Sequence, residues 1–201
     1  MIRPLIGLTQ RVEEVPGWNE RRDQLDQNWV HFVAALGGVP LPLPNHLETV
    51  RLLVPKLSGV ILTGGGDLAA LGGTAPERDA VEEELIGQAV RGSLPLVGVC
   101  RGLQALVQSA GGQMADVPGH IGSAHWIEGS WGGRRVNSFH RYGIIQMPEP
   151  WIIEAYSAED NLIEAIRHPT LPMAAVMWHP ERVVPFDPRD TTLFRNLLAL
   201  S

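Results

Sequence analysis

The sequence predicts an α/β fold, a three-layer sandwich built around a mixed, mainly parallel sheet. Two observations lead to this prediction. Over the first half of the 201-residue chain, short apolar runs alternate with amphipathic helical stretches, which is the pattern of βαβ units. After about residue 115 the pattern changes to short β-like segments that follow one another closely, and these add the mixed part of the sheet.

Four strands are expected in the parallel part of the sheet, at residues 4–8, 39–43, 59–62 and 94–99. Three of them are too apolar to be half exposed, as is typical of parallel strands that are covered on both faces. Binding sites in such sheets lie outside the carboxyl ends of the strands. The residues that follow these strands are therefore the first candidates for chemistry.

Helices are expected between and after these strands. The segment 20–36 carries apolar residues at helical spacing and ends at two glycines. The segment 76–91 begins with a proline and two acidic residues, which suit the first turn of a helix. A third helix is expected to follow Cys100 and to end at residues 111–112, and a last one at 191–200.

The second half of the chain is expected to add five short strands, at residues 134–138, 144–147, 151–156, 162–166 and 173–178. No internal repeat and no long linker divides the sequence. We therefore expect residues 1–201 to form a single domain.

Composition excludes several classes of partner. The formal net charge of -6 leaves no basic surface for nucleic acid or an anionic membrane. No signal-like N-terminus and no run of about 18 apolar residues is present, so we expect a cytoplasmic protein without a membrane partner. A single cysteine rules out an intramolecular disulfide and a cysteine-rich zinc site.

The segment around Cys100 carries the strongest chemical signal. An apolar strand runs into Cys100 and a helix follows, with Gly98 and Gly102 two residues to either side. Glycines at these positions give the backbone room for the sharp turn that raises a nucleophile above a sheet. The dipole at a helix N-terminus also favours a thiolate. The alternative is that Cys100 is a small apolar side chain in a core strand.

A base for this thiol is found after the last apolar strand, at His179-Pro180-Glu181. In extended backbone, residues two apart point to the same side, and Pro180 favours an extended residue before it. A carboxylate beside an imidazole fixes the tautomer of the ring and stabilises its charged form. The alternative is a surface histidine beside a solvated glutamate.

A third segment, Thr63 to Asp67, places three glycines directly after a buried strand. Such a loop can turn free N–H groups toward one point, which a developing oxyanion needs. It lacks the Lys-Ser/Thr ending of a P-loop and the glycine spacing of a dinucleotide site. A plain turn is the alternative.

Together, and in this chain order, the three segments resemble the class I glutamine amidotransferase-like superfamily. The resemblance implies a flavodoxin-like sheet and a catalytic triad of Cys100, His179 and Glu181. It also implies an oxyanion hole formed by the backbone N–H groups of Gly65 and Arg101.

Within that superfamily, residues 65–67, 78–79, 100–104 and 136–140 look like the γ-glutamyl-γ-aminobutyrate hydrolase group of peptidase C26. This likeness implies a hydrolase of a linear amide C–N bond that releases glutamate from a γ-glutamyl amide through a thioester. Synthetase-linked glutaminases typically have proline where this chain has Gly66, which favours a free-standing hydrolase.

The chain also resembles γ-glutamyl-CDP-amidate hydrolases of capsule phosphoramidate biosynthesis in the segments 7–11, 120–122, 137–140 and 160–161, and in Glu20 with Arg22 and Trp29. The small-molecule substrate is then expected to contact Gly66, Asp67, Gln104, Asn137, Ser138, His140, Arg11 and Arg22. The last two arginines would bind the diphosphate, since a guanidinium pairs two phosphate oxygens at once. The alternative is that both arginines are solvated or paired with nearby acidic residues.

The thioester route requires no metal or organic cofactor, and we expect none. His120 and His125 could be imagined as metal ligands, but no third ligand lies near them in sequence, so they are interpreted as loop residues near the cleft. Two other functions stay open: a glutaminase subunit that passes ammonia to a synthetase, and a binding module without turnover. The oligomeric state is not fixed by the sequence, and a homodimer is left open.

Overall fold

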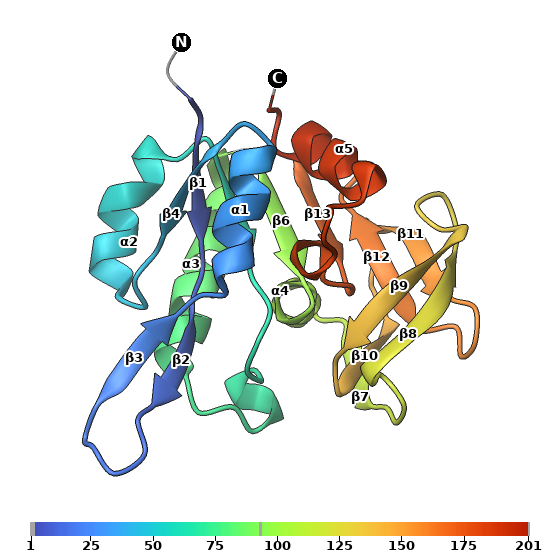
Figure 1. Cartoon of the computed structure of the whole chain (residues 1–201), viewed down its shortest axis with the longest axis horizontal. Coiled ribbons are helices and arrows are strands. Elements are labelled where there is room, and N and C mark those ends of the chain that lie inside the picture. The colour runs from blue at the N-terminus through green and yellow to red at the C-terminus, as the bar shows by residue number, and fades with distance from the viewer. Residues whose placement is uncertain (1–2, 93, 201) are drawn as a thin grey trace.

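The computed structural model describes residues 3–92 and 94–200, and within them an eleven-stranded sheet runs through the centre of the molecule (Figure 1). The strand order is β4-β1-β5-β6-β13-β12-β11-β8-β9, with β10 beside β12 and β7 beside β10. The strands of this sheet are β1 (Leu5–Leu8), β4 (Val39–Pro42), β5 (Gly59–Leu62), β6 (Leu96–Val99), β7 (Gln113–Asp116), β8 (Ile121–Glu128), β9 (Arg134–Phe139), β10 (Tyr142–Gln146), β11 (Ile152–Ser157), β12 (Ile163–Arg167) and β13 (Met173–Val176).

One half of the sheet is parallel and the other is antiparallel. Strands β4, β1, β5, β6 and β13 pair in parallel, whereas the pairings from β13 outward to β12, β11, β8 and β9 are antiparallel. Every residue of β5, β6 and β13 is buried, as the apolar sequence of these strands predicts. The predicted mixed sheet is confirmed, and its parallel part is formed by the strands from β4 to β13.

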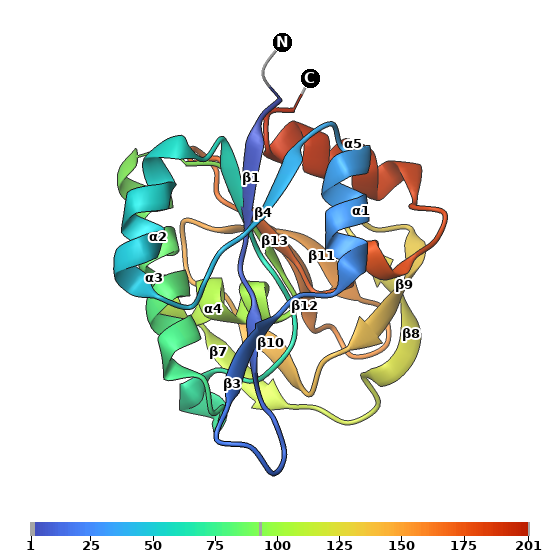
Figure 2. The same cartoon turned by 60° about the vertical axis from the view of Figure 1, so that its left-hand side comes forward.

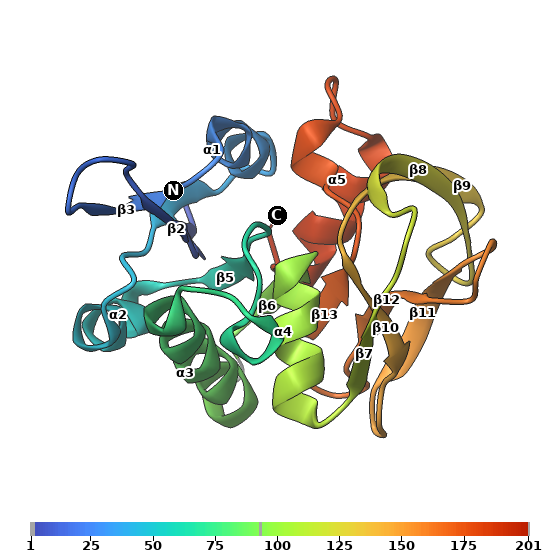
Figure 3. The same ribbon diagram turned by 90° about the horizontal axis from the view of Figure 1, so that it is seen from below.

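Helices cover both faces of the parallel half (Figure 3). Helices α1 (Gln27–Ala35) and α5 (Pro188–Leu197) share one face, where the rings of Phe32 and Phe194 pack edge to face with centroids 5.2 Å apart. Helices α2 (Leu47–Leu53), α3 (Pro76–Gly92) and α4 (Arg101–Ala110) lie on the other. In the part of the chain that the structure describes, none of the helices combines the length and the apolar character needed to cross a bilayer.

The expected helix at 20–36 is wrong at its start. Helix α1 begins after Asp26, whose carboxylate accepts a hydrogen bond of 2.9 Å from the backbone N–H of Asn28. The residues before it form a hairpin of β2 (Arg11–Glu14) and β3 (Arg21–Gln24), which projects beyond the sheet (Figures 1 and 2). Apart from Val12, the residues of the hairpin strands are polar, so neither strand shows the alternation that predicts a strand.

Besides the two hairpin strands, α2, β7 and β8 have no counterpart among the sequence predictions. Helix α2 has seven residues and buries only Val50, too few for a helical period to show. Strand β8 buries His125 and Ile127 on one face, so a histidine takes a position where an apolar residue would have revealed the strand. The expectation that His125 is a loop residue is therefore wrong.

Candidate active site

Cys100 lies at the sharp turn between β6 and α4. Its φ of 52° and ψ of -102° are values that a residue with a Cβ rarely adopts. The strand and the helix approach so closely that a Cβ on Gly98 would lie 2.6 Å from the carbonyl carbon of Gly102. A Cβ on Gly102 would in turn lie 2.2 Å from the carbonyl oxygen of Leu62. Both glycines are therefore required by close packing at the turn.

His179 and Glu181 follow β13 and contact each other. The Nδ1 atom of His179 lies 2.7 Å from Oε1 of Glu181, and both side chains are buried. His179 is extended, as Pro180 predicts, but residues 180–182 then form a short 3₁₀ turn. The turn, rather than a continued strand, brings the carboxylate back to the ring.

Burial opposes a charge on His179, because a low-dielectric surrounding disfavours the imidazolium. The Cys100 thiol and the Glu181 carboxylate outweigh burial and raise the pKa of His179 to about 9. At neutral pH the ring is then mainly protonated. An imidazolium in this place can stabilise a thiolate on Cys100 and can supply a proton to a departing group.

Strand β9 fixes the position of His179 through Asn137. The side-chain amide of Asn137 donates to the backbone carbonyl of His179 at 2.8 Å, and its oxygen accepts from the backbone N–H of His179 at 2.8 Å. The ring of Phe139 packs edge-on against the imidazole, with centroids 5.6 Å apart. Asn137 was expected to bind substrate, but its amide is engaged by the backbone of His179.

The glycine loop lies against the same imidazole. A Cβ on Gly64 would lie 2.5 Å from Cε1 of His179, and Gly65 and Gly66 have φ values of 93° and 74°. The side chain of Arg78 donates to the carbonyl oxygens of Gly65 and Thr63 from the interior. These contacts turn the two carbonyls inward, and an oxyanion hole formed by the N–H of Gly65 stays a prediction.

A buried ionic network joins the glycine loop to the turn at Cys100. Glu82 pairs with Arg78 at 2.8 Å and also with Arg101, which contacts Asp79 as well. Burial raises the pKa of Glu82, but the two guanidinium groups outweigh it and hold that pKa below its ordinary value. Sequence reasoning gave Glu82 no role, although its position four residues after Arg78 on a helix was a visible signal.

Cys100 and His179 line one cavity of about 240 Å³. Its walls are Gly65, Gly66, Asp67, Cys100, Arg101, Gln104, Phe139, His140, Arg141, His179 and Arg182. Most of the predicted site residues are thus brought together. Arg141 and Arg182 were not predicted, because a cation next to a motif carries no signal of its own in a single sequence.

A second cavity, of about 160 Å³, lies on the other side of His179 and shares Gly65 and Arg182 with the first. Arg11 lines it, and the binding of a ligand beyond the scissile bond by this residue stays a prediction. Arg22 lines neither cavity: it is exposed, and its Nε lies 2.8 Å from Glu20. The predicted substrate contact of Arg22 is therefore not supported, and the ion-pair alternative holds for this residue.

Ser138 also lies outside both cavities. It is buried, and its hydroxyl donates to the backbone carbonyl of His120 at 2.8 Å. On a strand, neighbouring residues face opposite sides, so Asn137 contacts His179 on one side and Ser138 contacts His120 on the other. The predicted contact of Ser138 with substrate is not seen in this arrangement.

A sequence model of the peptidase C26 family matches residues 4–131 and 122–181. The chain belongs to the peptidase C26 family. A γ-glutamyl-CDP-amidate hydrolase of Campylobacter jejuni is 30% identical to it, over 88% of this chain and 90% of the relative. A γ-glutamyl-γ-aminobutyrate hydrolase of Escherichia coli O157:H7 is 27% identical, over 90% of this chain and 87% of the relative.

A solved structure supports the fold of this peptidase C26 protein. A GMP synthase subunit from Thermoplasma acidophilum superposes with a TM-score of 0.75 and 18% identity, over 100% of this chain and 94% of the other. The class I glutamine amidotransferase-like fold is thereby confirmed. The family and its hydrolase relatives also support the predicted class of reaction, hydrolysis of an amide bond.

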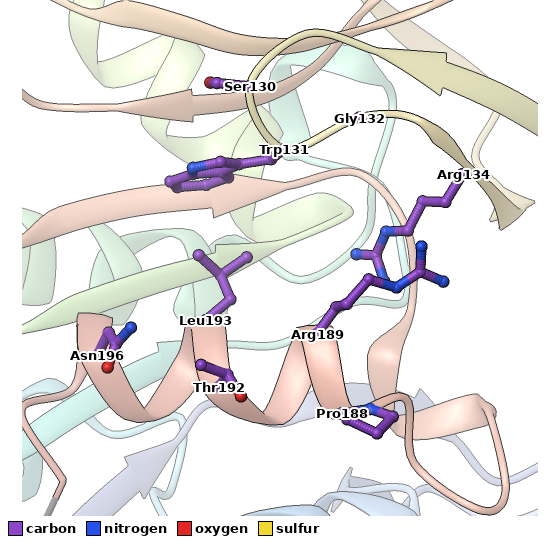
Figure 4. Close-up of a pocket in the computed structure, with 9 residues that line it drawn as sticks. All are labelled: Ser130, Trp131, Gly132, Arg134, Pro188, Arg189, Thr192, Leu193 and Asn196. Carbon is purple, nitrogen blue, oxygen red and sulfur yellow. The ribbon is translucent and has the colours of Figure 1, made fainter.

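A larger cavity of the C26 protein lies elsewhere. It measures about 520 Å³ and lies between residues 130–134 and helix α5, where Trp131 and Leu193 approach each other (Figure 4). None of the predicted site residues lines it. Neither Cys100 nor His179 lines it, and its cations pair with acidic residues, Arg134 with Asp187 and Asp190 and Arg189 with Asp187.

Proposed function

We propose that this chain is a cysteine-dependent hydrolase that releases glutamate from a γ-glutamyl amide. The observation that carries the proposal is the shared cavity: Cys100, at a strained strand-to-helix turn, lines it together with His179, whose ring is paired with buried Glu181. The two C26 relatives named as γ-glutamyl hydrolases support the substrate class.

In the first step, the Cys100 thiolate attacks the γ-carbonyl carbon and forms a C–S bond. The N–H groups of Gly65 and Arg101 hold the oxyanion; the N–H of Arg101 is at the first position of α4, where no intrahelical acceptor exists. His179 gives its proton to the amide nitrogen as the C–N bond breaks. The products of this step are a thioester and a free amine.

In the second step, water attacks the thioester. His179, now neutral, takes a proton from the water, and the Cys100 thiolate leaves as the C–S bond breaks. Glu181 keeps the ring oriented and stabilises its charged form in both steps. Glutamate is released and the resting charges are restored.

The charges around the first cavity suit the glutamyl group. Asp67 supplies a carboxylate for the α-amino group, while Arg141 and Arg182 supply cations for the α-carboxylate. Gln104 adds a side-chain carbonyl, since its amide nitrogen already donates to the backbone carbonyl of Tyr142 at 2.9 Å. Opposite charges placed at two points fix the orientation of a zwitterion as well as its position.

The second cavity is proposed to receive the leaving group, with γ-glutamyl-CDP-amidate as substrate. His179 separates the two cavities, so an amide placed over Cys100 would extend its nitrogen side toward Arg11. The guanidinium of Arg11 matches two phosphate oxygens. Its present partners are half-buried Gln24 at 3.2 Å and exposed Glu13 at 4.0 Å, contacts that a ligand can replace.

The test compares kcat/KM for γ-glutamyl-CDP-amidate, γ-glutamyl-γ-aminobutyrate and glutamine. The diphosphate substrate should be preferred, and Arg11→Ala should lower its kcat/KM by about tenfold or more, as the loss of a charge-assisted hydrogen bond does. Arg22→Ala is the matched control and should leave the preference unchanged. Equal values for the first two substrates would reject the diphosphate pocket, and glutamine hydrolysis that rises with a synthetase would indicate a glutaminase subunit.

A further inference from the structure

Four buried ionisable side chains meet in the antiparallel half of the sheet, and the proposed reaction uses none of their ionisable groups. His120 precedes β8, His125 lies on β8, His140 follows β9, and Glu164 lies on β12. None is more than 5% exposed. Three of these groups, those of His120, His140 and Glu164, offer ligand atoms that all lie within 4.8 Å of one another.

The polar atoms of this histidine cluster have few partners among the described residues. Both ring nitrogens of His125 and of His140, and both carboxylate oxygens of Glu164, are buried without a hydrogen bond to any residue that the structure describes. Nε2 of His125 lies 3.3 Å from Oε1 of Glu164, and Nε2 of His140 lies 3.6 Å from the same oxygen, without hydrogen-bond geometry. Buried polar atoms are almost always paired, so the cluster requires a further partner.

His120 is oriented as a ligand by its own neighbours. Its Nε2 lies 2.7 Å from Oδ2 of Asp160, which can accept the Nε2 proton. Nδ1 is then left with a lone pair. Ser138 lies 3.3 Å from Nδ1, but its hydroxyl proton is donated to the backbone carbonyl of His120. A carboxylate that fixes the tautomer of a histidine in this way is typical of metal sites.

We propose that His120, His140 and Glu164 bind a zinc ion. Two imidazoles and one carboxylate form a ligand set that zinc uses, and His125 is available as the fourth ligand. In a tetrahedral site with bonds near 2.1 Å, ligand atoms lie about 3.4 Å apart, so small side-chain rotations would close the cluster around the ion. The ion would also neutralise the buried carboxylate of Glu164.

The position of the cluster indicates a structural role for the ion. Ser138, which contacts His120, is next to Asn137, which holds the backbone of His179. On the other side, the backbone carbonyl of Glu164 accepts a hydrogen bond of 2.8 Å from Met177, two residues before His179. A bound ion would therefore tie together two of the strands that position His179, and this inference does not depend on which substrate is hydrolysed.

The first test uses the unmutated chain and no activity assay. Chelator-treated protein should take up one zinc ion per chain, with a higher Tm, because an ion that binds only the folded state stabilises it. Cobalt should replace zinc and give the visible absorption of a tetrahedral site with nitrogen and oxygen ligands. The absence of uptake at zinc concentrations well above those of the protein would overturn the proposal.

Variants then assign the ligands. His140→Gln and Glu164→Gln should abolish the cobalt spectrum, whereas Asp160→Asn, at a partly exposed position, should weaken zinc binding by about 10- to 100-fold. His31→Gln, an exposed histidine on α1, is the matched control and should bind normally. If a ligand variant fails to fold, the zinc affinity of Asp160→Asn still tests the proposal, because Asp160 orients His120 and is not itself a ligand. Zinc binding that is unchanged in Asp160→Asn and His140→Gln would contradict the site.

Discussion

The parallel and antiparallel halves of the sheet contribute to the candidate site in different ways. The parallel half supplies the proposed nucleophile and the proposed oxyanion loop from short contiguous segments: Cys100 directly after β6 and the glycine loop directly after β5. The antiparallel half supplies positioning groups from far along the chain, since Asn137 holds His179 across 42 residues. His179 lies where the two halves meet, after the last parallel strand.

This difference follows from strand geometry. Parallel strands end at the same edge of a sheet, so the topology alone brings the residues that follow them close together. In an antiparallel pair, which residues come together depends on register and on turns, and a slip by one residue exchanges the faces of the strand. We therefore expect mutations in the two halves to have different effects. Mutations in the parallel half should remove a reacting group, whereas mutations in the antiparallel half should displace one.

The largest expected effect is on turnover at the boundary residue. His179→Ala should lower kcat by about 10⁴-fold or more, and Glu181→Gln should cost at least tenfold less, because the carboxylate orients the proton carrier but does not carry the proton. Steady-state kinetics and thermal unfolding of both variants give the comparison. The reverse order of effects would mean that Glu181 has another role.

The next effect tests the framework of the parallel half. Glu82→Gln should lower the free energy of unfolding by about 3–5 kcal/mol, because Arg78 and Arg101 would remain buried without their shared carboxylate. Urea denaturation measures the change. Glu83→Gln, on the exposed face of the same helix, is the control and should change stability by less than about 0.5 kcal/mol. Equal changes in the free energy of unfolding for Glu82→Gln and Glu83→Gln would show that the buried network does not stabilise the fold.

In the antiparallel half, Asn137→Ala should lower kcat by about 10- to 100-fold while KM changes little, because the variant displaces His179 without touching the substrate. Asn196→Ala, an exposed asparagine on α5, should leave kcat unchanged. A rise in KM with constant kcat would instead make Asn137 a substrate contact, as the sequence alone predicts.

The smallest effect is a shift in pH dependence. Since the pKa of His179 is raised to about 9, the ring loses its proton as the pH rises through that value, and kcat/KM should fall above it by about tenfold per pH unit. Glu181→Gln should move this fall in kcat/KM to lower pH, because the carboxylate that it removes stabilises the charged ring. A pH profile whose upper limb is the same in both proteins would contradict the pairing.

Sequence predicted most of the parallel half and less of the rest. Gly98, Cys100 and Gly102 form a local pattern whose steric reason can be read directly from residue types. The hairpin at 11–24 was missed, because its strands bury almost nothing and its ion pairs leave no period in the sequence. The histidine cluster was missed because His140 and Glu164 join His120 only after the strands pair.

The contacts of β9 with His179 and His120 could not be predicted either, because they too depend on strand pairing. Asn137 and Ser138 form one motif in the sequence, and only the alternation of a strand shows that one supports His179 and the other His120. Arg22 was assigned to substrate from a shared segment, whereas its position in the hairpin directs it to Glu20. Motifs thus identified which segments matter, while pairing decided what each side chain contacts.

The central claim, that Cys100 forms a thioester with the glutamyl group, has one direct measurement. Protein mixed with a γ-glutamyl amide and rapidly quenched in acid should carry a glutamyl adduct on the Cys100 peptide by mass spectrometry, and added hydroxylamine should convert the intermediate to a γ-glutamyl hydroxamate. Cys100→Ala should retain the Tm of the unmutated protein and yield neither product. Turnover that requires Cys100 but gives neither adduct nor hydroxamate would contradict the thioester and leave the thiol only a base.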